Sequence, residues 1–139
     1  MSIDPISLDT HSVFARTIWG EARGEGRSGM EAVASVILNR ADRPGWWGTD
    51  VKSVCLAPWQ FSCWLPDDPN REKMLAVDVS DPQFEIASEI AAKALAGELA
   101  DGTGHADSYV NLAVDQPRWI EGAKETCVIG HHTFYITRA

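Results

Sequence analysis

The sequence predicts an α+β domain that is mostly helical, with a small β element near the C-terminal end. Apolar residues recur at helical spacing in three segments before residue 97, whereas β-branched and aromatic residues cluster after residue 125. The length of 139 residues suits one compact domain, so we expect residues 1–139 to form a single domain. A chain of this length should bury about two-thirds of its unfolded surface.

The helices are expected in three main segments. The first covers Thr10–Ala22 behind a cap at Asp9 or Thr10, and the second begins at a capping box over Ser28–Glu31 and stops before Pro44. The apolar residues of the second helix are spread widely enough to predict burial on more than one side. The third starts at the Asp81 cap, has Pro82 in its first turn and ends at Gly97.

The remaining segments are less regular. Residues 46–69 are expected to be irregular apart from a short helix over Asp50–Leu56. Ser108–Leu112 reads as a short extended piece. Residues 126–129 and 133–137 are rich in β-branched and aromatic side chains, and predict one bent strand or a small hairpin around Gly130.

Composition excludes several classes of partner. The chain has 12 Lys and Arg against 20 Asp and Glu, a formal net charge of -8, which argues against nucleic-acid binding and against adhesion to anionic membranes. The sequence has no run of about 18 apolar residues and no secretory signal pattern at its start. We therefore expect synthesis in the cytoplasm without a signal peptide.

The three cysteines are too few for a disulfide framework. Cys55 and Cys63 could pair, but reduced core cysteines are the favoured reading. A cysteine nucleophile, Cys63 or Cys127 with His131 or His132, would predict an amidase or peptidase.

A zinc site is the second alternative, although no Cys-x-x-Cys or His-Glu-x-x-His spacing supports it. His131 and His132 would point in opposite directions on a strand, which disfavours joint ligation. We expect no metal and no cofactor.

Glu21 is the first candidate for catalysis. It falls on the stripe of Phe14 and Ile18 at the end of the first helix, where loss of water favours the protonated carboxyl that a general acid needs. The alternative is an ion pair with Arg23 or Arg27. Glu25 is either a second carboxylate at the site or a solvated turn residue.

The chain has six tryptophans, and four lie between residues 46 and 64. Flat aromatic faces and amide side chains suit sugar rings and N-acetyl groups. In the run Trp59-Gln60-Phe61-Ser62-Cys63-Trp64 we expect Phe61 and most tryptophans in the core, and Gln60 and Ser62 at the site. Trp119 is a candidate for the wall of the groove. A non-catalytic glycan-binding module would also explain these aromatic residues.

The runs Ile18-Trp19-Gly20-Glu21-Ala22-Arg23-Gly24-Glu25-Gly26, Val36-Ile37-Leu38-Asn39-Arg40 and Gln60-Phe61-Ser62-Cys63-Trp64 together resemble the SleB-type cell wall hydrolase family. This family includes spore-cortex-lytic enzymes and many phage endolysins. The resemblance is strong over residues 15–64 and resumes more weakly at residues 117–119 and 129–135. Only Tyr109 matches the family's Thr-His-Tyr-His stretch, so Tyr109 is carried over as a residue that would hold the N-acetyl sugars with Gln60 and Ser62, and no histidine role is carried over there.

The resemblance implies a lysozyme-like fold and cleavage of the β-1,4 bond between N-acetylmuramic acid and N-acetylglucosamine. It implies Glu21 as the general acid and base, and peptidoglycan glycan strands as the partner of a monomeric enzyme. We expect a phage or prophage endolysin that acts as a lytic transglycosylase or a muramidase. Because peptidoglycan is anionic, we expect basic residues near the cleft, namely Arg23, Arg27, Arg40 and Arg118.

Overall fold

The computed structural model describes residues 4–58 and 60–138. The expected stacking or core role of Trp59 lies outside these residues. Among the described residues, four short 3₁₀ turns accompany five helices and three strands. The turns are η1 (Pro5–Ser7), η2 (Arg23–Glu25), η3 (Ser62–Trp64) and η4 (Arg118–Gly122). The helices are α1 (Thr10–Ala22), α2 (Gly26–Asp42), α3 (Val51–Leu56), α4 (Pro69–Ala76) and α5 (Pro82–Leu95), and the strands are β1 (Ser108–Val110), β2 (Lys124–Ile129) and β3 (His132–Ile136).

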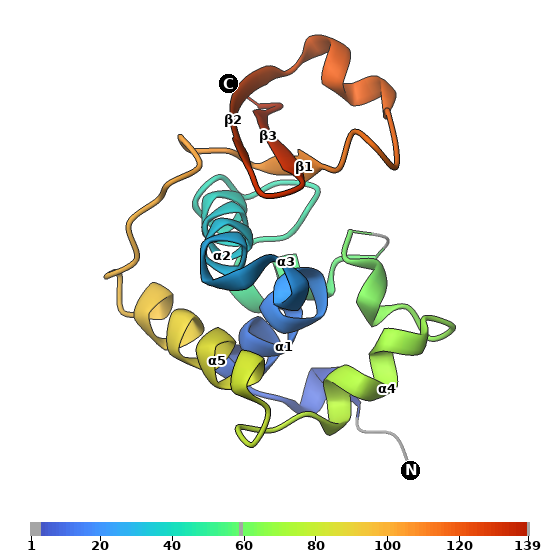
Figure 1. The fold of residues 1–139 in the computed structure, drawn as a ribbon, viewed down its shortest axis with the longest axis vertical. Helices are drawn as coiled ribbons and strands as arrows, with labels where there is room; N and C mark the ends of the chain where they lie inside the picture. Colours follow the sequence, from blue (N-terminus) through green and yellow to red (C-terminus); the bar gives the residue numbers. More distant parts are fainter. Residues whose placement is uncertain (1–3, 59, 139) are drawn as a thin grey trace.

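Two lobes are visible in Figure 1, a helical lobe and a small sheet that lies beyond α2 near the C-terminus. Helix α1 is the centre of the helical lobe and packs against α2, α3, α4 and α5. It begins where the Asp9 side chain accepts a hydrogen bond from the Ser12 amide at 2.8 Å. Phe14 and Ile18 are fully buried, so the predicted apolar stripe of α1 is confirmed.

Helix α2 joins the two lobes because it is buried on two sides, as its sequence predicts. Val33 and Ile37 pack into the core of the helical lobe, whereas Ala32 and Val36 pack against Phe134 of the sheet. The predicted start at a capping box on Ser28 is wrong. Turn η2 (Arg23–Glu25) runs directly into α2, which begins two residues before Ser28, so that Ser28 lies inside the helix.

Aspartate caps also begin the two shorter helices. The expected short helix is α3, and Asp50 and Ser53 form its capping box. Helix α4 was not predicted, although Asp68 caps it and Pro69 occupies its first turn in the same arrangement that Asp81 and Pro82 give α5.

The three strands form an antiparallel sheet in the order β1-β3-β2. Tyr109 of β1 lies opposite Phe134 of β3, and a bulge interrupts β2 between Glu125 and Cys127. Strands β2 and β3 are joined at Gly130, whose φ of 60° is accessible to glycine at little cost. The predicted hairpin around Gly130 is confirmed.

The three cysteines are free thiols, with Cys55 and Cys63 buried and Cys127 half-buried, so the reduced reading is confirmed. Trp19, Trp47 and Trp64 are buried together with Phe61, as expected, whereas Trp46 and Trp119 are exposed. Within the described residues, no helix combines the length and the apolar character needed to cross a bilayer.

Candidate functional site

A hydrogen bond joins the two lobes at the end of α1. The hydroxyl of Tyr109 on β1 donates to Oε1 of Glu21 at 2.6 Å, and the Glu21 residue is half-buried. The ring of Tyr109 meets His132 edge-on, at 4.9 Å between centroids, and packs against the tilted ring of Phe134 at 5.6 Å. The fold therefore brings together the two residues that the sequence singled out 88 positions apart.

The surroundings of this pair keep Tyr109 a proton donor. Burial raises the pKa of Tyr109 well above its usual value, and the charge and hydrogen bond of Glu21 raise it further. Burial likewise raises the pKa of the Cys63 thiol, to which the nearby charge of Glu21 adds. At neutral pH the Tyr109 hydroxyl and the Cys63 thiol are therefore both uncharged, and both lie next to the carboxyl group of Glu21.

Arg40 is the cation beside this site. It is buried, its Nε donates to the Asp107 carbonyl at 2.7 Å, and one terminal nitrogen lies 3.4 Å from Oε1 of Gln60. Burial lowers the pKa of Arg40, although the neighbouring Tyr109, Asp107 and Glu21 oppose that effect. A buried guanidinium whose hydrogen bonds are satisfied is a fixed source of positive potential.

The two arginines considered as ion-pair partners of Glu21 bind elsewhere. Arg23 donates to Asn70 Oδ1 at 2.8 Å and stacks over the Trp19 ring at 4.2 Å. Arg27 forms an exposed salt bridge with Glu89 at 3.3 Å. Among the described residues, neither Arg23 nor Arg27 therefore forms the ion pair with Glu21 that the sequence left open.

Glu25 is held by two histidines, which corrects the reading of a solvated turn residue. Its carboxylate is only 14% exposed, with Nδ1 of His131 at 2.9 Å and Nδ1 of His132 at 3.5 Å. The hydrogen bond from His131 is the largest effect that lowers the pKa of Glu25, and burial opposes it.

The expectation that the two histidines point in opposite directions is also wrong. His131 lies in the hairpin turn and β3 begins only at His132, so strand alternation does not apply to the pair.

A polar cavity of about 660 Å³ lies beside Tyr109 and is the best candidate for a substrate groove. Its lining consists of Arg40, Trp46, Gln60, Ser108, Tyr109, Val110, Asp115, Pro117, Trp119, Thr137 and Arg138. Three predicted site residues, Gln60, Tyr109 and Trp119, therefore share one cavity. Trp119 is 39% exposed and meets the ring of Tyr135 edge-on at 5.3 Å.

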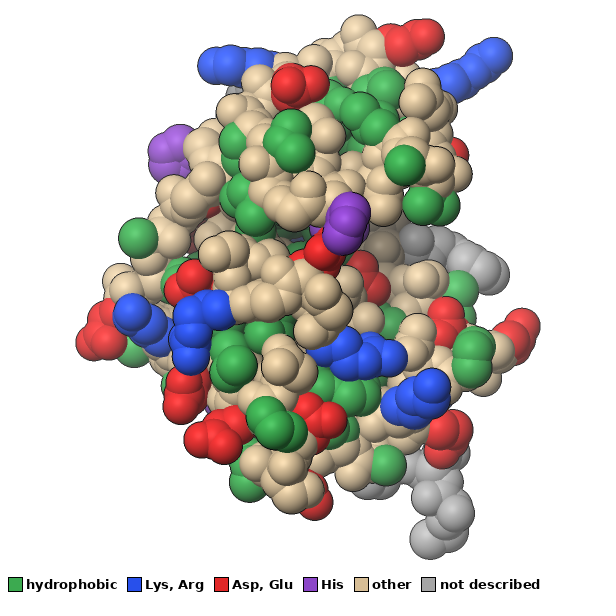
Figure 2. Space-filling model, in the orientation of Figure 1, with side chains coloured by type: hydrophobic (Ala, Val, Ile, Leu, Met, Phe, Trp, Pro, Cys, Tyr) green, Lys and Arg blue, Asp and Glu red, His purple; other side chains and the backbone are tan. Residues whose placement is uncertain are grey.

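Other predicted residues lie outside the polar cavity. Ser62 is exposed on η3 (Ser62–Trp64) and is not part of the lining. Of the four arginines expected near the cleft, only Arg40 lines it. On the face of the molecule that Figure 2 displays, acidic and basic side chains are interspersed over the helical lobe. Sequence reasoning did not assign Trp46 or Arg138 to the site, and only the tryptophan excess pointed toward Trp46.

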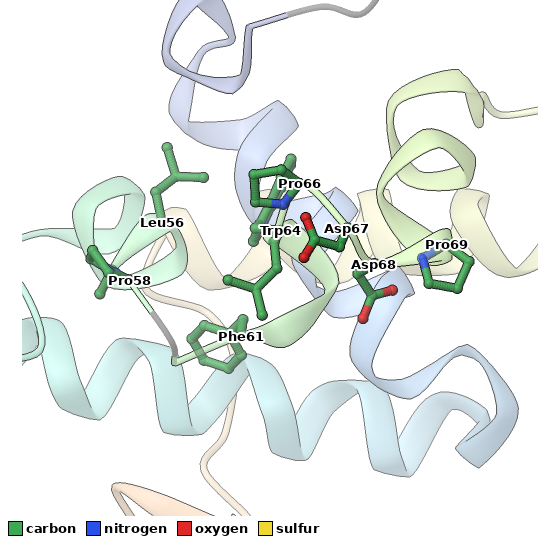
Figure 3. Close-up of a pocket in the computed structure, with 10 residues that line it drawn as sticks. Leu56, Pro58, Phe61, Trp64, Pro66, Asp67, Asp68 and Pro69 are labelled. Carbon is green, nitrogen blue, oxygen red and sulfur yellow. The ribbon is translucent and has the colours of Figure 1, made fainter.

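A second, apolar cavity of about 730 Å³ lies between α3 and α4. Phe61, Trp64 and three prolines form much of its lining, and Asp67 and Asp68 lie at its edge (Figure 3). Neither lining includes Glu21. The polar cavity is the better candidate, because Tyr109 both lines it and binds Glu21.

The geometry does not favour a cysteine nucleophile. Cys63 is buried with a raised pKa, and Cys127 Sγ faces the Thr103 carbonyl at 3.7 Å. The histidines proposed as bases are at Glu25 instead. In residues 4–58 and 60–138, no group of three or more His, Cys, Asp or Glu side chains has an arrangement that could hold a metal ion.

Comparison with known proteins identifies similar sequences. A family model described as Cell Wall Hydrolase matches residues 24–135. The spore cortex-lytic enzyme of Halalkalibacterium halodurans is 32% identical over 127 residues, which cover 88% of this chain and 33% of that protein. The Bacillus cereus enzyme of the same description is 31% identical over 125 residues, covering 88% of this chain and 42% of the relative. The chain thus spans well under half the length of these curated relatives.

Solved structures share the fold. The catalytic domain of the germination-specific lytic transglycosylase SleB from Bacillus anthracis matches with a TM-score of 0.68 and 29% identity, covering 93% of this chain and 95% of that one. The catalytic domain of the Bacillus cereus SleB protein matches with a TM-score of 0.71 and 27% identity, covering 91% and 88%. These matches confirm the predicted fold class, a mostly helical, lysozyme-like domain with a small sheet.

Proposed function

The chain belongs to the Cell Wall Hydrolase family, and from that premise we propose that it cleaves the β-1,4 bond between N-acetylmuramic acid and N-acetylglucosamine in peptidoglycan, with Glu21 as general acid and base. Residues 1–139 act as one catalytic domain and as a monomer on glycan strands. The observation that carries the proposal is the hydrogen bond of 2.6 Å between the Tyr109 hydroxyl and Glu21, beside a cavity lined by two exposed tryptophans and the half-buried amide of Gln60.

In the first step, Glu21 gives its proton to the glycosidic oxygen as the bond to the muramic C1 breaks. The carboxylate that forms is stabilised by the Tyr109 hydroxyl, which remains protonated because its pKa is raised. Glu21 then takes the proton of the attacking group and returns to its starting state. One carboxyl can perform both transfers, because it is an acid before bond cleavage and a base afterwards.

The attacking group that we propose is the 6-hydroxyl of the same muramic residue, which gives a 1,6-anhydro product without consuming water. This lytic transglycosylase route needs no second carboxylate, which accords with the binding of Glu25 by His131 and His132. The B. anthracis structural neighbour is itself described as a lytic transglycosylase. Attack by water would instead make the enzyme a muramidase.

Substrate contacts are proposed for four further residues. Gln60 and Trp119 line the polar cavity, where an amide and an indole face suit N-acetyl groups and sugar rings. Ser62, exposed on η3, would contact a sugar outside this cavity. Glu25 would act at the margin of the site, through the histidines that hold it.

The decisive experiment replaces Glu21 with glutamine and follows release of soluble fragments from purified peptidoglycan. We expect loss of cleavage with an unchanged circular dichroism spectrum and melting temperature, because glutamine has the same shape but cannot donate the proton. Glu98→Gln, at an exposed position beyond α5, is the matched control and should remain active. Cleavage by Glu21→Gln at the wild-type rate would refute the assignment.

Mass spectrometry of the same digests distinguishes the two routes. Products of the transglycosylase route are one water lighter than products of hydrolysis. As the biological setting we propose a phage or prophage endolysin. The test is expression in a Gram-negative host, where lysis should follow only when the inner membrane is permeabilised separately.

A further inference from the structure

Two guanidinium groups share one aromatic ring at the polar cavity. The ring of Trp47 is fully buried, and Arg40 and Arg138 lie over it with their central carbons 5.4 Å and 5.1 Å from its centroid. Both arginines line the cavity. Such cation–π contacts fix the direction of a guanidinium while leaving its N–H groups available.

The backbone that carries Arg138 is fixed as well. The buried carboxylate of Asp107 accepts hydrogen bonds from the Thr137 amide at 3.1 Å, the Thr137 hydroxyl at 2.7 Å and the Arg138 amide at 3.2 Å. Arg43 donates to the Arg138 carbonyl at 3.1 Å. The side chain therefore starts from a defined point, although it lies near the end of the chain.

The two arginines differ in how many N–H groups remain available to bind a ligand. Arg40 is buried and donates to Asp107 and Gln60. Arg138 is exposed, and within residues 4–58 and 60–138 its guanidinium has no hydrogen-bond acceptor and no acidic partner at salt-bridge distance. Asp115 is the one acidic side chain among the described residues that line the cavity. Arg138 is therefore the cation with N–H groups to offer.

We propose that Arg138 binds a carboxylate carried by the muramic residue of the substrate, and so makes the cavity selective for carboxylate-bearing glycan strands. The proposal rests on the proposed function, because it places this residue of the strand next to Tyr109 and Glu21. The carboxylate belongs either to the lactyl group itself or to the peptide joined to it. A planar guanidinium matches either one with two parallel hydrogen bonds.

The charge of the protein makes such a contact necessary. With a net charge of -8 the chain repels an anionic polymer at long range, so attraction must come from cations at the contact itself. Trp46, 69% exposed, and Trp119 line the same cavity and offer indole faces to the sugar rings beside the carboxylate. Neutral contacts would then hold the glycan, and Arg138 would select its substituent.

The test measures strand binding by tryptophan fluorescence in the Glu21→Gln background, and KM and kcat in the otherwise wild-type enzyme. Four substrates are prepared from one peptidoglycan. Two are peptide-bearing strands and strands stripped by an amidase to free the lactyl carboxylate, and the other two are samples of each coupled to methylamine to neutralise their carboxylates. Arg138→Gln should raise Kd and KM about tenfold on carboxylated strands with little change in kcat. On neutralised strands it should equal the parent enzyme.

Three further variants separate the carboxylate contact from other effects. Arg138→Lys keeps the charge but not the two-pronged geometry, so its Kd should be intermediate. A Cβ at Gly45 would overlap the Arg138 guanidinium, so Gly45→Ala should displace that group and weaken binding without removing its charge. Lys124→Gln, exposed on β2, removes the same charge away from the cavity and should leave Kd unchanged.

If the loss of Arg138 weakens binding of peptide-bearing strands only, the ligand is the peptide carboxylate. If it weakens binding of stripped strands, the ligand is the lactyl carboxylate. The proposal is overturned if Arg138→Gln binds carboxylated strands like its parent, or loses the same factor on neutralised strands. Failure of the proposed function looks different, because Glu21→Gln would then still cleave, or the wild type would cleave none of the strands. The fluorescence measurement reports on Arg138 in either case.

Discussion

Replacing Tyr109 with phenylalanine removes one oxygen atom from the site and is expected to slow glycan cleavage. The ring should stay in place, because its contacts with His132 and Phe134 do not involve the hydroxyl. What is lost is the hydrogen bond of 2.6 Å to Oε1 of Glu21. In the proposed mechanism Glu21 becomes a carboxylate in the transition state, so this bond strengthens as the reaction proceeds and its loss should lower kcat.

The size of the effect follows from the change in that bond. A hydrogen bond to a neutral acceptor contributes about 1 kcal/mol, and one to a charged acceptor about 1.5–3 kcal/mol. The difference of about 0.5–2 kcal/mol corresponds to a fall in kcat of roughly 2- to 30-fold. Stability should change by about 1 kcal/mol, a few degrees in melting temperature.

The assay is the initial rate of fragment release from purified peptidoglycan at saturating substrate, with calorimetry on the same sample. Tyr135→Phe is the matched control, since Tyr135 is also buried in the sheet but its ring faces Trp119. An unchanged kcat in Tyr109→Phe would refute the argument that its hydroxyl stabilises the Glu21 carboxylate. A fall in melting temperature much larger than a few degrees would refute the argument that the ring of Tyr109 stays packed without its hydroxyl.

Three other outcomes are expected. Asp107→Asn should lower the free energy of unfolding by about 2–4 kcal/mol, because an amide cannot accept hydrogen bonds from all the donors that the buried carboxylate binds. Urea unfolding measures this, and an unfolding midpoint equal to that of the wild type would contradict it. Cys55, whose pKa is raised to about 12, and Cys63, whose pKa is also raised, should resist alkylation at pH 8 until the chain is unfolded, with cleavage unaffected. The hydrogen bond from His131 lowers the pKa of Glu25. The stabilisation that the Glu25 carboxylate provides is therefore complete above the ordinary glutamate pKa of about 4.3 and is lost as the pH falls through the lowered pKa. Melting temperatures of the wild type and of Glu25→Gln, measured from pH 6 to pH 2, should converge as the pH falls.

Local signals predicted most of the elements correctly. The Asp9 and Asp81 caps predicted helices α1 and α5, because a cap acts over one turn and depends on few neighbours. Asp68 caps α4 in the same way, although α4 is not among the helices expected from the sequence. The predicted start of α2 is wrong because turn η2 continues directly into the helix.

The candidate site was predictable only in part. Glu21 and Tyr109 could be named from their motifs, since a carboxyl on an apolar stripe is visible in the periodicity of one helix. Their contact could not, because it depends on how β1 docks against the end of α1. Arg138 had no signal at all, as its place over Trp47 follows from the return of the last strand to the loop after α2.

The sequence by itself determined the helical core, the C-terminal hairpin, the anionic charge and the family of this chain, because each depends on short-range periodicity, on composition or on local motifs. The tertiary structure alone decided which polar side chains meet: Tyr109 with Glu21, two histidines with Glu25, and two arginines over one indole. The physical reason is that hydrogen bonds and ion pairs act over a few ångströms, whereas the residues they join are separated in the sequence by as many as 107 positions.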